Sequence, residues 1–249
     1  MKESAGKRIA VRCGVLLLTG VLWGMVGCGQ GKASEKPEQK EMLQYELLKV
    51  QDPDNTNVAG LLQEKAAGCM VRIQTENLAG SGVIWHTNAE KMVILTAAHV
   101  LDGAKEVTVT FCNQENMKVS AHKLRIAEDC DLGILEIPSA ALPDSVWEDC
   151  RTVVADKEFY DRMGAGDRIL VMGSVLEAAG NAYEGRLKES WIFLEDYDQY
   201  MMLAATYAEP GMSGGGVFDE QGRLIGILSG ADGQGNLAIV PLAFILREF

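Results

Sequence analysis

The stretch EPGMSGGGVFDEQGRLIGILSG, residues 209–230, holds one serine among glycines and then runs through a turn into an apolar strand. Glycine adopts backbone angles that other residues avoid and lets the chain approach neighbouring groups closely. An activated serine needs such surroundings, because backbone N–H groups must point at the oxyanion that develops in acyl transfer. Ser213 is therefore a candidate nucleophile, with the N–H groups of Gly211 and Ser213 as oxyanion donors. A flexible bend that merely contains a serine is the alternative.

The candidate base is His99, which lies in VILTAAHVL, residues 93–101. An apolar strand ends there in small residues, and the imidazole follows directly. Of the three histidines in the chain, His86 falls in an expected hairpin turn and His122 in a polar stretch. His99 is thus the histidine best placed for chemistry, and a structural or surface histidine is the alternative.

The candidate orienting acid is Asp131, in EDCDLGILEI, residues 128–137. It stands immediately before an alternating apolar strand, where a carboxylate can accept a hydrogen bond from the imidazole Nδ1–H. That contact fixes the tautomer of the base and stabilises the imidazolium. Asp129 is the less favoured alternative because it lies two residues farther from the strand. In the ordinary structural interpretation, either aspartate would only cap a turn.

Twelve short apolar segments, six before residue 140 and six after residue 160, have the β-branched content and turn punctuation of strands. Long helices are not regularly interposed between them. This pattern predicts an all-β fold of two six-stranded antiparallel barrels, at about 68–140 and 160–241, in a folded body over residues 58–249. The segment LAFILREF after Pro241 predicts a short C-terminal helix.

The start of the chain has the features of an export signal. Four basic residues precede an apolar run over residues 13–27, which is shorter than the about 20 residues of a membrane span. The run ends in MVGC, which resembles the lipobox of bacterial lipoproteins. We expect a signal peptide at 1–27, lipidation of Cys28, a polar tether at 28–57, and a membrane-anchored location in the cell envelope, on the outer side of the cytoplasmic membrane. An uncleaved signal anchor is the alternative.

Charge and cysteine content exclude some partners. The net charge of −12 opposes binding to phosphate backbones, so we expect no nucleic-acid partner. The sequence contains no C-x-x-C spacing, and we expect no metal site. Four cysteines of the body permit disulfides in three connectivities or remain as thiols, and the sequence does not choose: Cys69, Cys112, Cys130 and Cys150.

The motifs TAAH, DCDLGILEI and GMSGGG, in this order, resemble the trypsin/chymotrypsin-fold serine proteases. The pattern is most similar to the bacterial Deg/HtrA-like branch, through AGSGVIW, GDRILVMGS and NLAIVP, over about residues 68–245. The resemblance implies a serine endopeptidase without cofactor, acting on protein or peptide substrates. It makes His99 the base, Asp131 its orienting acid and Ser213 the nucleophile. We expect no regulatory peptide-binding domain, and the oligomeric state is left open.

The resemblance also places a substrate pocket, at Tyr207, Ala208, Leu228, Ser229, Gly230 and Leu237. Tyr207 stands six residues before Ser213, where an aspartate would favour Lys or Arg substrates, so a trypsin-like preference is not expected. Met212 replaces the usual aspartate or asparagine, and Gly216 the usual proline or alanine. These departures motivate a second hypothesis, a catalytically silent relative that binds peptides or assembles a surface complex. A third is an unrelated β-rich lipoprotein.

Overall fold

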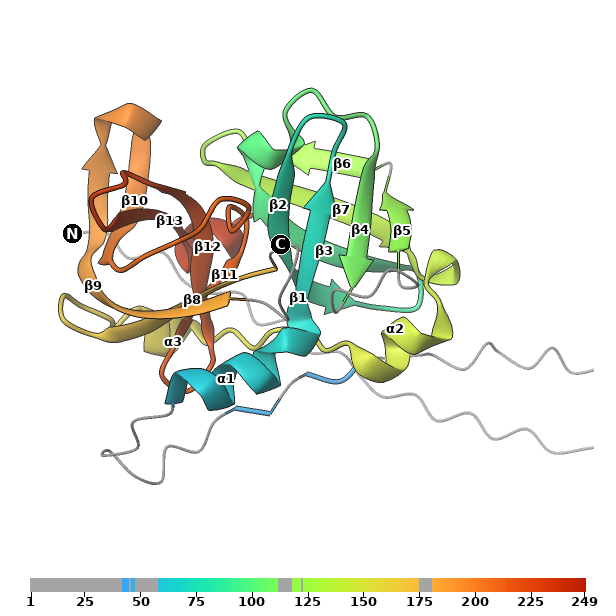
Figure 1. Ribbon diagram of the computed structural model, residues 1–249, viewed down its shortest axis with the longest axis horizontal. Helices are drawn as coiled ribbons and strands as arrows, with labels where there is room; N and C mark the ends of the chain where they lie inside the picture. The colour runs from blue at the N-terminus through green and yellow to red at the C-terminus, as the bar shows by residue number, and fades with distance from the viewer. Residues whose placement is uncertain (1–41, 45, 48–57, 112–117, 122, 175–180) are drawn as a thin grey trace, which may run out of the picture. The chain divides into compact units, whose positions relative to one another are not determined.

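Two antiparallel β-sheets form the folded part of the chain (Figure 1). The computed structural model describes residues 42–44, 46–47, 58–111, 118–121, 123–174 and 181–249. All of them belong to the unit Gln39–Phe249. The signal peptide, Cys28 and most of the expected tether lie outside the described residues.

The first sheet has seven strands in the order β5-β4-β1-β2-β3-β7-β6. Their bounds are β1 (Met70–Gln74), β2 (Ala79–Thr87), β3 (Lys91–Ala97), β4 (Val107–Phe111), β5 (Lys118–Ala121), β6 (Lys123–Ile126) and β7 (Leu132–Pro138). The second sheet closes into a barrel in the order β10-β13-β12-β11-β8-β9. Its strands are β8 (Arg168–Gly173), β9 (Asn181–Leu194), β10 (Gln199–Ala205), β11 (Gly216–Asp219), β12 (Leu224–Ala231) and β13 (Asn236–Pro241).

The all-β prediction is confirmed, and the strand count of the first half needs a correction. That sheet has seven strands instead of six, and the strand pairing closes only the second sheet into a barrel. The additional strand is β5, which pairs with β4, whereas β6 pairs with β7. The sequence of β5, KVSA, alternates polar and small apolar residues over only four positions. Such a short and weakly apolar segment gives little strand signal.

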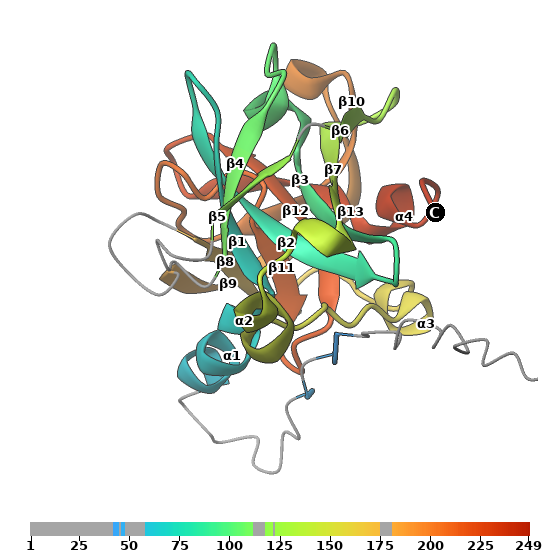
Figure 2. The ribbon, with the colours of Figure 1, turned by 90° about the vertical axis from the view of Figure 1, so that its right-hand side faces the viewer.

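Helices are short and lie at the connections. They are α1 (Val58–Ala66), η1 (Ala67–Cys69), η2 (Ala98–Leu101), η3 (Ser139–Ala141), α2 (Asp144–Asp149), α3 (Lys157–Tyr160), η4 (Glu195–Tyr197) and α4 (Leu242–Ile245), where η denotes a 3-10 helix. The expected C-terminal helix is present as α4, which lies beside β13 (Figure 2). In the part of the chain that the structure describes, no helix is long and apolar enough to span a membrane.

Strand β3 is apolar at almost every position because both of its faces are buried. Its side chains alternate between two hydrophobic cores. Met92 and Ile94 point into the core of the first sheet. Val93 and Leu95 belong to the second core, which fills the barrel of the second sheet. This second core is continuous across the junction, so apolar packing holds the two sheets together.

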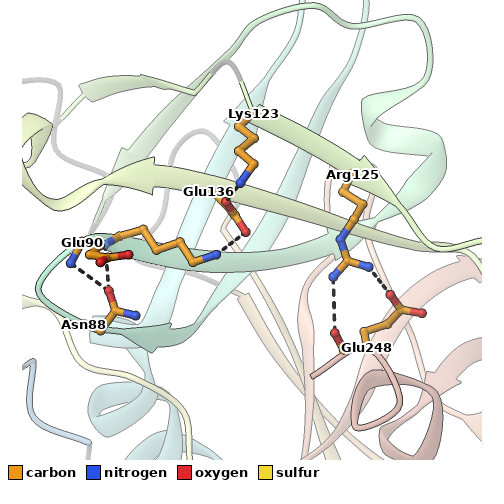
Figure 3. Close-up of polar contacts among 7 residues, drawn as sticks. Asn88, Glu90, Lys123, Arg125, Glu136 and Glu248 are labelled. Carbon is orange, nitrogen blue, oxygen red and sulfur yellow. Dashed lines mark hydrogen bonds and ion pairs between the residues drawn. The ribbon is translucent and has the colours of Figure 1, made fainter.

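Ion pairs add to this junction at the C-terminus. Arg125 of β6 forms an ion pair with Glu248, just after α4 (Figure 3). On the same sheet, Lys91 and Lys123 both pair with Glu136 of β7. The pair between Arg125 and Glu248 ties the end of the chain to the first sheet.

The segment expected to act as a polar tether contacts the folded body in one place. Met42 is buried in the core of the first sheet. Gln44 forms an isolated parallel bridge with Thr152. Residues 42–44 are therefore part of the fold, and the tether prediction stays a prediction for the residues outside the described ranges.

The cysteines that the structure describes carry thiols. They are Cys69, Cys130 and Cys150. The Cys69 thiol donates to the carbonyl of Ala66 at 2.9 Å. Burial is the main reason that the pKa of Cys130 is raised to about 11. Cys112 lies outside the described residues.

Candidate active site

Strand register brings His99 and Asp131 together. In the antiparallel pair of β3 and β7, Ala97 lies opposite Leu132. His99 follows the end of β3 by two residues, in η2, and Asp131 precedes the start of β7 by one. Neighbouring residues of η2 are anchored in the core of the first sheet. Two residues that are 32 positions apart therefore meet at the same end of one sheet.

The carboxylate of Asp131 receives hydrogen bonds from three donors. His99 Nδ1 lies 2.9 Å from Asp131 Oδ2. The backbone N–H of His99 donates to Asp131 Oδ1, also at 2.9 Å. The hydroxyl of Ser229, on β12 of the second sheet, donates to Oδ2. Asp131 itself is held in place by its backbone N–H, which donates to Gln199 Oε1 at 3.1 Å.

These contacts shift both titrating groups in the direction that an acid–base pair needs. The hydrogen bond and the negative charge of Asp131 raise the pKa of His99, against the opposing effect of burial. Burial pushes the pKa of Asp131 upward, but the hydrogen bonds from His99 and Ser229 outweigh it and the net pKa is lowered. Asp131 is therefore ionised wherever His99 titrates, and Nδ1 carries the proton that the carboxylate accepts.

Ser213 lies in the connection between β10 and β11, in a loop whose shape depends on glycine. Gly211 and Gly214 have φ angles of 92° and 85°, which side chains with a Cβ rarely adopt. At Gly214 there is also no space, because a Cβ would lie 2.1 Å from Thr96 Oγ1 and 2.2 Å from the Ser81 carbonyl oxygen. The glycines thus allow this loop to press against β2 and β3 of the first sheet.

Ser81 of β2 makes four hydrogen bonds, and two of them connect this loop to the first sheet. Its backbone N–H donates to the carbonyl of Ser213 at 2.7 Å. Its hydroxyl donates to the carbonyl of Gly211 at 2.7 Å and accepts from the N–H of Ser174 at 2.9 Å. Its carbonyl accepts from Thr96 Oγ1 at 2.7 Å. Every polar group of this fully buried serine is therefore engaged, and two of the bonds hold the peptide units beside the candidate oxyanion donors.

On the opposite side, β12 of the second sheet holds the loop. The N–H of Gly214 donates to the carbonyl of Leu228 at 2.8 Å, and the N–H of Leu228 donates to the carbonyl of Gly215 at 2.9 Å. The next residue, Ser229, donates to Asp131. Two consecutive residues of one strand thus contact the serine loop and the acid of the first sheet.

The side chain of Met212 packs on the inner side of the loop. It is fully buried, and its thioether accepts the N–H of Glu209 at 3.2 Å. The N–H of Met212 donates back to the carbonyl of Glu209 at 3.1 Å. A Cβ at Gly173 would lie 2.7 Å from Met212 Cγ, so the methionine packs directly on that backbone. Met212 therefore fills space within the core and bridges a tight turn.

The groups expected to perform chemistry on the Ser213 side have no partner in the described residues. The hydroxyl of Ser213 makes no hydrogen bond to His99 there. The backbone N–H groups of Gly211 and Ser213 also donate to no other group in the described ranges. The structure thus brings His99 and Asp131 into contact and places the serine loop against their sheet, without a bond between base and nucleophile.

The residues expected to line a substrate pocket fall into different environments. Leu228 and Leu237 are buried in the core of the second barrel, because alternate side chains of its strands point inward. Ser229 is engaged with Asp131. Tyr207 is 58% exposed and contacts the ring of Tyr183 edge-on. The partly buried Ala208 packs against the second core.

Gly230 has a different setting from the other five expected pocket residues. It borders a cavity of about 650 Å³ together with Ala231 and Ala238. The role of all six residues in substrate binding stays a prediction.

Sequence reasoning did not identify three residues that support the site: Ser81, Gln199 and Tyr197. The hydroxyl of Tyr197 lies next to Ser229 and Gly230, and burial raises the pKa of this phenol. Among the three, Ser81 lies in the motif AGSGVIW, which contributes to the family resemblance and does not indicate a role for this serine. Within the described ranges, no group of three or more His, Cys, Asp or Glu side chains is arranged to hold a metal ion.

Comparisons with known proteins place this site in a family. Residues 80–227 match the family described as trypsin-like peptidase domain. A curated relative, the "Serine protease HtrA-like" of Staphylococcus aureus strain bovine RF122, is 27% identical over 188 residues. The relative of the same description from strain USA300 is 26% identical over 185 residues. Each match covers 70% of this chain and 23% of the relative, so the chain spans about a quarter of the length of these relatives.

Solved structures show the same fold at low sequence identity. The Rv3671c protease of M. tuberculosis H37Rv, crystallised in an inactive form, has a TM-score of 0.60 at 19% identity, covering 79% of this chain and 92% of its own. The HtrA-type protease AlgW, solved with a tripeptide, has a TM-score of 0.61 at 23% identity, covering 76% of this chain and 61% of its own. The family match extends over more than half of the chain and includes His99, Asp131 and Ser213. The chain belongs to the trypsin-like peptidase domain family.

Proposed function

We propose that the protein is a serine endopeptidase that cleaves protein or peptide substrates. The observation that carries this proposal is the contact between His99 Nδ1 and Asp131 Oδ2, at 2.9 Å, at the place where the glycine-shaped loop of Ser213 meets the first sheet. A carboxylate that orients an imidazole beside a serine is the arrangement that activates a hydroxyl for acyl transfer.

In the proposed reaction, the hydroxyl of Ser213 attacks the carbonyl carbon of the peptide bond while His99 Nε2 takes its proton. Asp131 holds the imidazole and stabilises the imidazolium. The N–H groups of Gly211 and Ser213 donate to the oxyanion of the tetrahedral intermediate. His99 then gives its proton to the leaving amine, and an acyl-enzyme remains on Ser213. Water, deprotonated by His99, hydrolyses that ester and restores the serine.

Covalent labelling tests this proposal directly. The purified protein is treated with a fluorophosphonate probe and compared with Ser213→Ala. We expect labelling of the wild type and none of the variant, because the probe reacts with an activated serine. Circular dichroism and the melting temperature of Ser213→Ala show whether the variant is folded. Absence of labelling in the folded wild type, or equal labelling of both proteins, contradicts the proposal.

A second candidate function is supported by the missing bond between Ser213 and His99. If the site is permanently held in that arrangement, the protein binds peptides without cleaving them. Labelling separates the two functions, because a silent relative binds peptides and is not labelled. Met212 is relevant to this candidate, since its buried side chain sets the shape of the turn that leads to Ser213.

We also propose that the enzyme is exported and anchored by a lipid on Cys28. The support is in the sequence: a basic start, a short apolar run and the ending MVGC. Expression of the full chain in a bacterium with an alkyne-bearing fatty acid tests it. We expect the label on the wild type and its loss in Cys28→Ala, together with release from the membrane fraction. Equal labelling and membrane association of Cys28→Ala contradicts the anchor.

A further inference from the structure

A concave surface of the protein begins at His99. It is a cavity of about 870 Å³ with His99 and Asp131 in its wall. The remaining wall comes from the residues before β7, from the tip of the β9–β10 hairpin and from α4. That hairpin, orange in Figure 1, carries η4 at its tip. None of these other residues takes part in the proposed reaction, and Gln199 and Tyr197 only support the site.

Aromatic side chains line this region and extend over the outer face of the hairpin. Trp191, Phe193 and Tyr200 are 48%, 45% and 46% exposed, which is unusual for neighbouring aromatic residues. The ring of Trp191 stacks on Tyr200 at 5.2 Å and on Phe244 of α4 at 5.4 Å. The guanidinium of Arg247 lies 4.1 Å from the centre of the Phe244 ring. One cation of the protein itself is thus already bound on an aromatic face of this cluster.

The same cavity is lined by four acidic residues and by one arginine, Arg247. The acidic residues are Glu128, Asp129, Asp196 and Asp198. All four are exposed, and none forms an ion pair within the residues that the structure describes. The carboxylates in the fold junction behave differently, since Glu136 and Glu248 are each paired with lysine or arginine. These four carboxylates outnumber the guanidinium of Arg247, so the wall of the cavity has an excess of negative charge.

We propose that this surface binds a segment of the polypeptide substrate that contains lysine or arginine, at positions away from the cleaved bond. The proposal rests on the endopeptidase function proposed above. Exposed aromatic faces attract lysine and arginine by cation–π interaction, and the carboxylates add hydrogen bonds and long-range attraction. Continuity with His99 directs the bound segment toward the reacting serine, and the volume admits several side chains rather than a single small cation.

Binding to an inactive enzyme tests the surface separately from catalysis. The protein is Ser213→Ala, and the probe is a fluorescein-labelled octapeptide of alternating arginine and glycine. The comparison peptide has citrulline in place of arginine, which keeps the shape and removes the charge. Binding is measured by fluorescence anisotropy. We expect the arginine peptide to bind and the citrulline peptide to bind at least tenfold more weakly.

Two charge variants, each made in the Ser213→Ala background, locate the binding. Asp196→Asn with Asp198→Asn removes two carboxylates of the surface, and asparagine accepts the positive φ of 51° at position 198 as readily as aspartate. Glu76→Gln with Asp102→Asn removes the same charge from a different cavity, at the loops beside β1 and η2. We expect the first variant to weaken binding at least tenfold and the second less than twofold. Phe193→Ala is expected to weaken it about threefold, because this aromatic side chain lies in the wall of the cavity.

The outcomes separate failure of this surface from failure of the enzyme. Equal weakening by both double variants means attraction by net charge alone and overturns the proposal. So does equal binding of the citrulline peptide, or no binding of the arginine peptide. Fluorophosphonate labelling reports on the catalytic site independently. It compares the wild type with the double variant Asp196→Asn and Asp198→Asn, in which the native Ser213 is kept. We expect that labelling to be unchanged by the double variant.

Discussion

The two halves of the candidate site are held in different ways. His99 and Asp131 come from one sheet, and side-chain hydrogen bonds join them directly. Ser213 comes from the other sheet, and its loop is held mainly through its own backbone groups, which bond to the backbone and hydroxyl of Ser81 and to the backbone of Leu228. The contact between base and acid therefore forms within the first sheet, and Ser229 and Gln199 of the second sheet add hydrogen bonds to Asp131. The nucleophile half depends on how closely two sheets dock.

This difference implies that electrostatic effects dominate in the half with His99 and Asp131, and steric effects in the half with Ser213. A change in the first half is expected to alter the charge and protonation of the base while the fold stays intact. A change in the second half is expected to alter backbone position, and with it the oxyanion donors and the stability of the sheet junction. The following four substitutions test this distinction in order of decreasing effect on turnover.

Asp131→Asn removes the charge that defines the first half. We expect kcat/KM to fall about 10⁴-fold, because the amide no longer holds the correct tautomer of His99. Since Asp131 raises the pKa of His99, its loss lowers that pKa. The base is active when neutral, so the acidic limb of the pH–rate profile shifts to lower pH in the variant. Asp129→Asn is the matched control, and a similar loss in that control would contradict the assignment.

Gly214→Ala tests the backbone of the second half. The new methyl group would lie 2.1 Å from Thr96 Oγ1, and φ is 85°. The loop must move, so we expect a loss of about 10²–10³ in kcat from misplaced oxyanion donors. Strain should lower the free energy of unfolding by about 1–3 kcal/mol. Gly233→Ala has φ of 72° and open space, so it carries the strain without the collision. Equal activity losses in both variants would show that sheet contact at Gly214 is unimportant.

Ser81→Ala removes two of the hydrogen bonds that connect the sheets. The carbonyl of Gly211 and the N–H of Ser174 each lose a partner, at about 1–3 kcal/mol for a buried polar group. We expect kcat to fall roughly tenfold with little change in KM, because small displacements of reacting groups slow chemistry more than binding. Urea denaturation and steady-state kinetics measure both effects. The exposed Ser120, on the same sheet, provides a control as Ser120→Ala, and an unchanged kcat for Ser81→Ala would refute the role.

Met212→Leu is the mildest change. Volume is nearly conserved, so we expect a destabilisation of less than about 1.5 kcal/mol. The variant loses the thioether that accepts the N–H of Glu209. A reduction of turnover within threefold would show that Met212 acts mainly by filling space. Met172→Leu, another fully buried methionine, serves as the control. A much larger loss of kcat at Met212 alone would show that the sulfur contact shapes the site.

Much of the fold was predictable from the sequence because buried strand positions are occupied by apolar residues in a regular pattern. Strand β3 reads as a continuous apolar run since its alternate side chains enter two different cores. His99 and Asp131 were predictable for a related reason: each stands at the end of such a run, and antiparallel strands bring their ends together. Strand β5, with four weakly apolar residues, left no comparable trace.

The supporting residues could not be predicted, because their role depends on distant partners. Ser81 and Gly211 are 130 positions apart, and no local pattern encodes their hydrogen bond. The same applies to Asp131 and Ser229, which are 98 positions apart. For the expected substrate pocket, closeness to the site along the sequence carries no information on side-chain direction. Leu228 and Leu237 are buried in the second core, and their role in substrate binding stays a prediction.

The division of the site between two sheets has a consequence for the newly made chain. A chain in which only the first sheet has formed contains the base and its acid, but no positioned nucleophile. A chain in which only the second has formed contains Ser213 in a loop that lacks its contacts with Ser81. Under the proposed mechanism, neither intermediate can cleave peptides. Under that mechanism, peptidase activity arises only when the two sheets dock, so a partly folded copy cannot digest other chains.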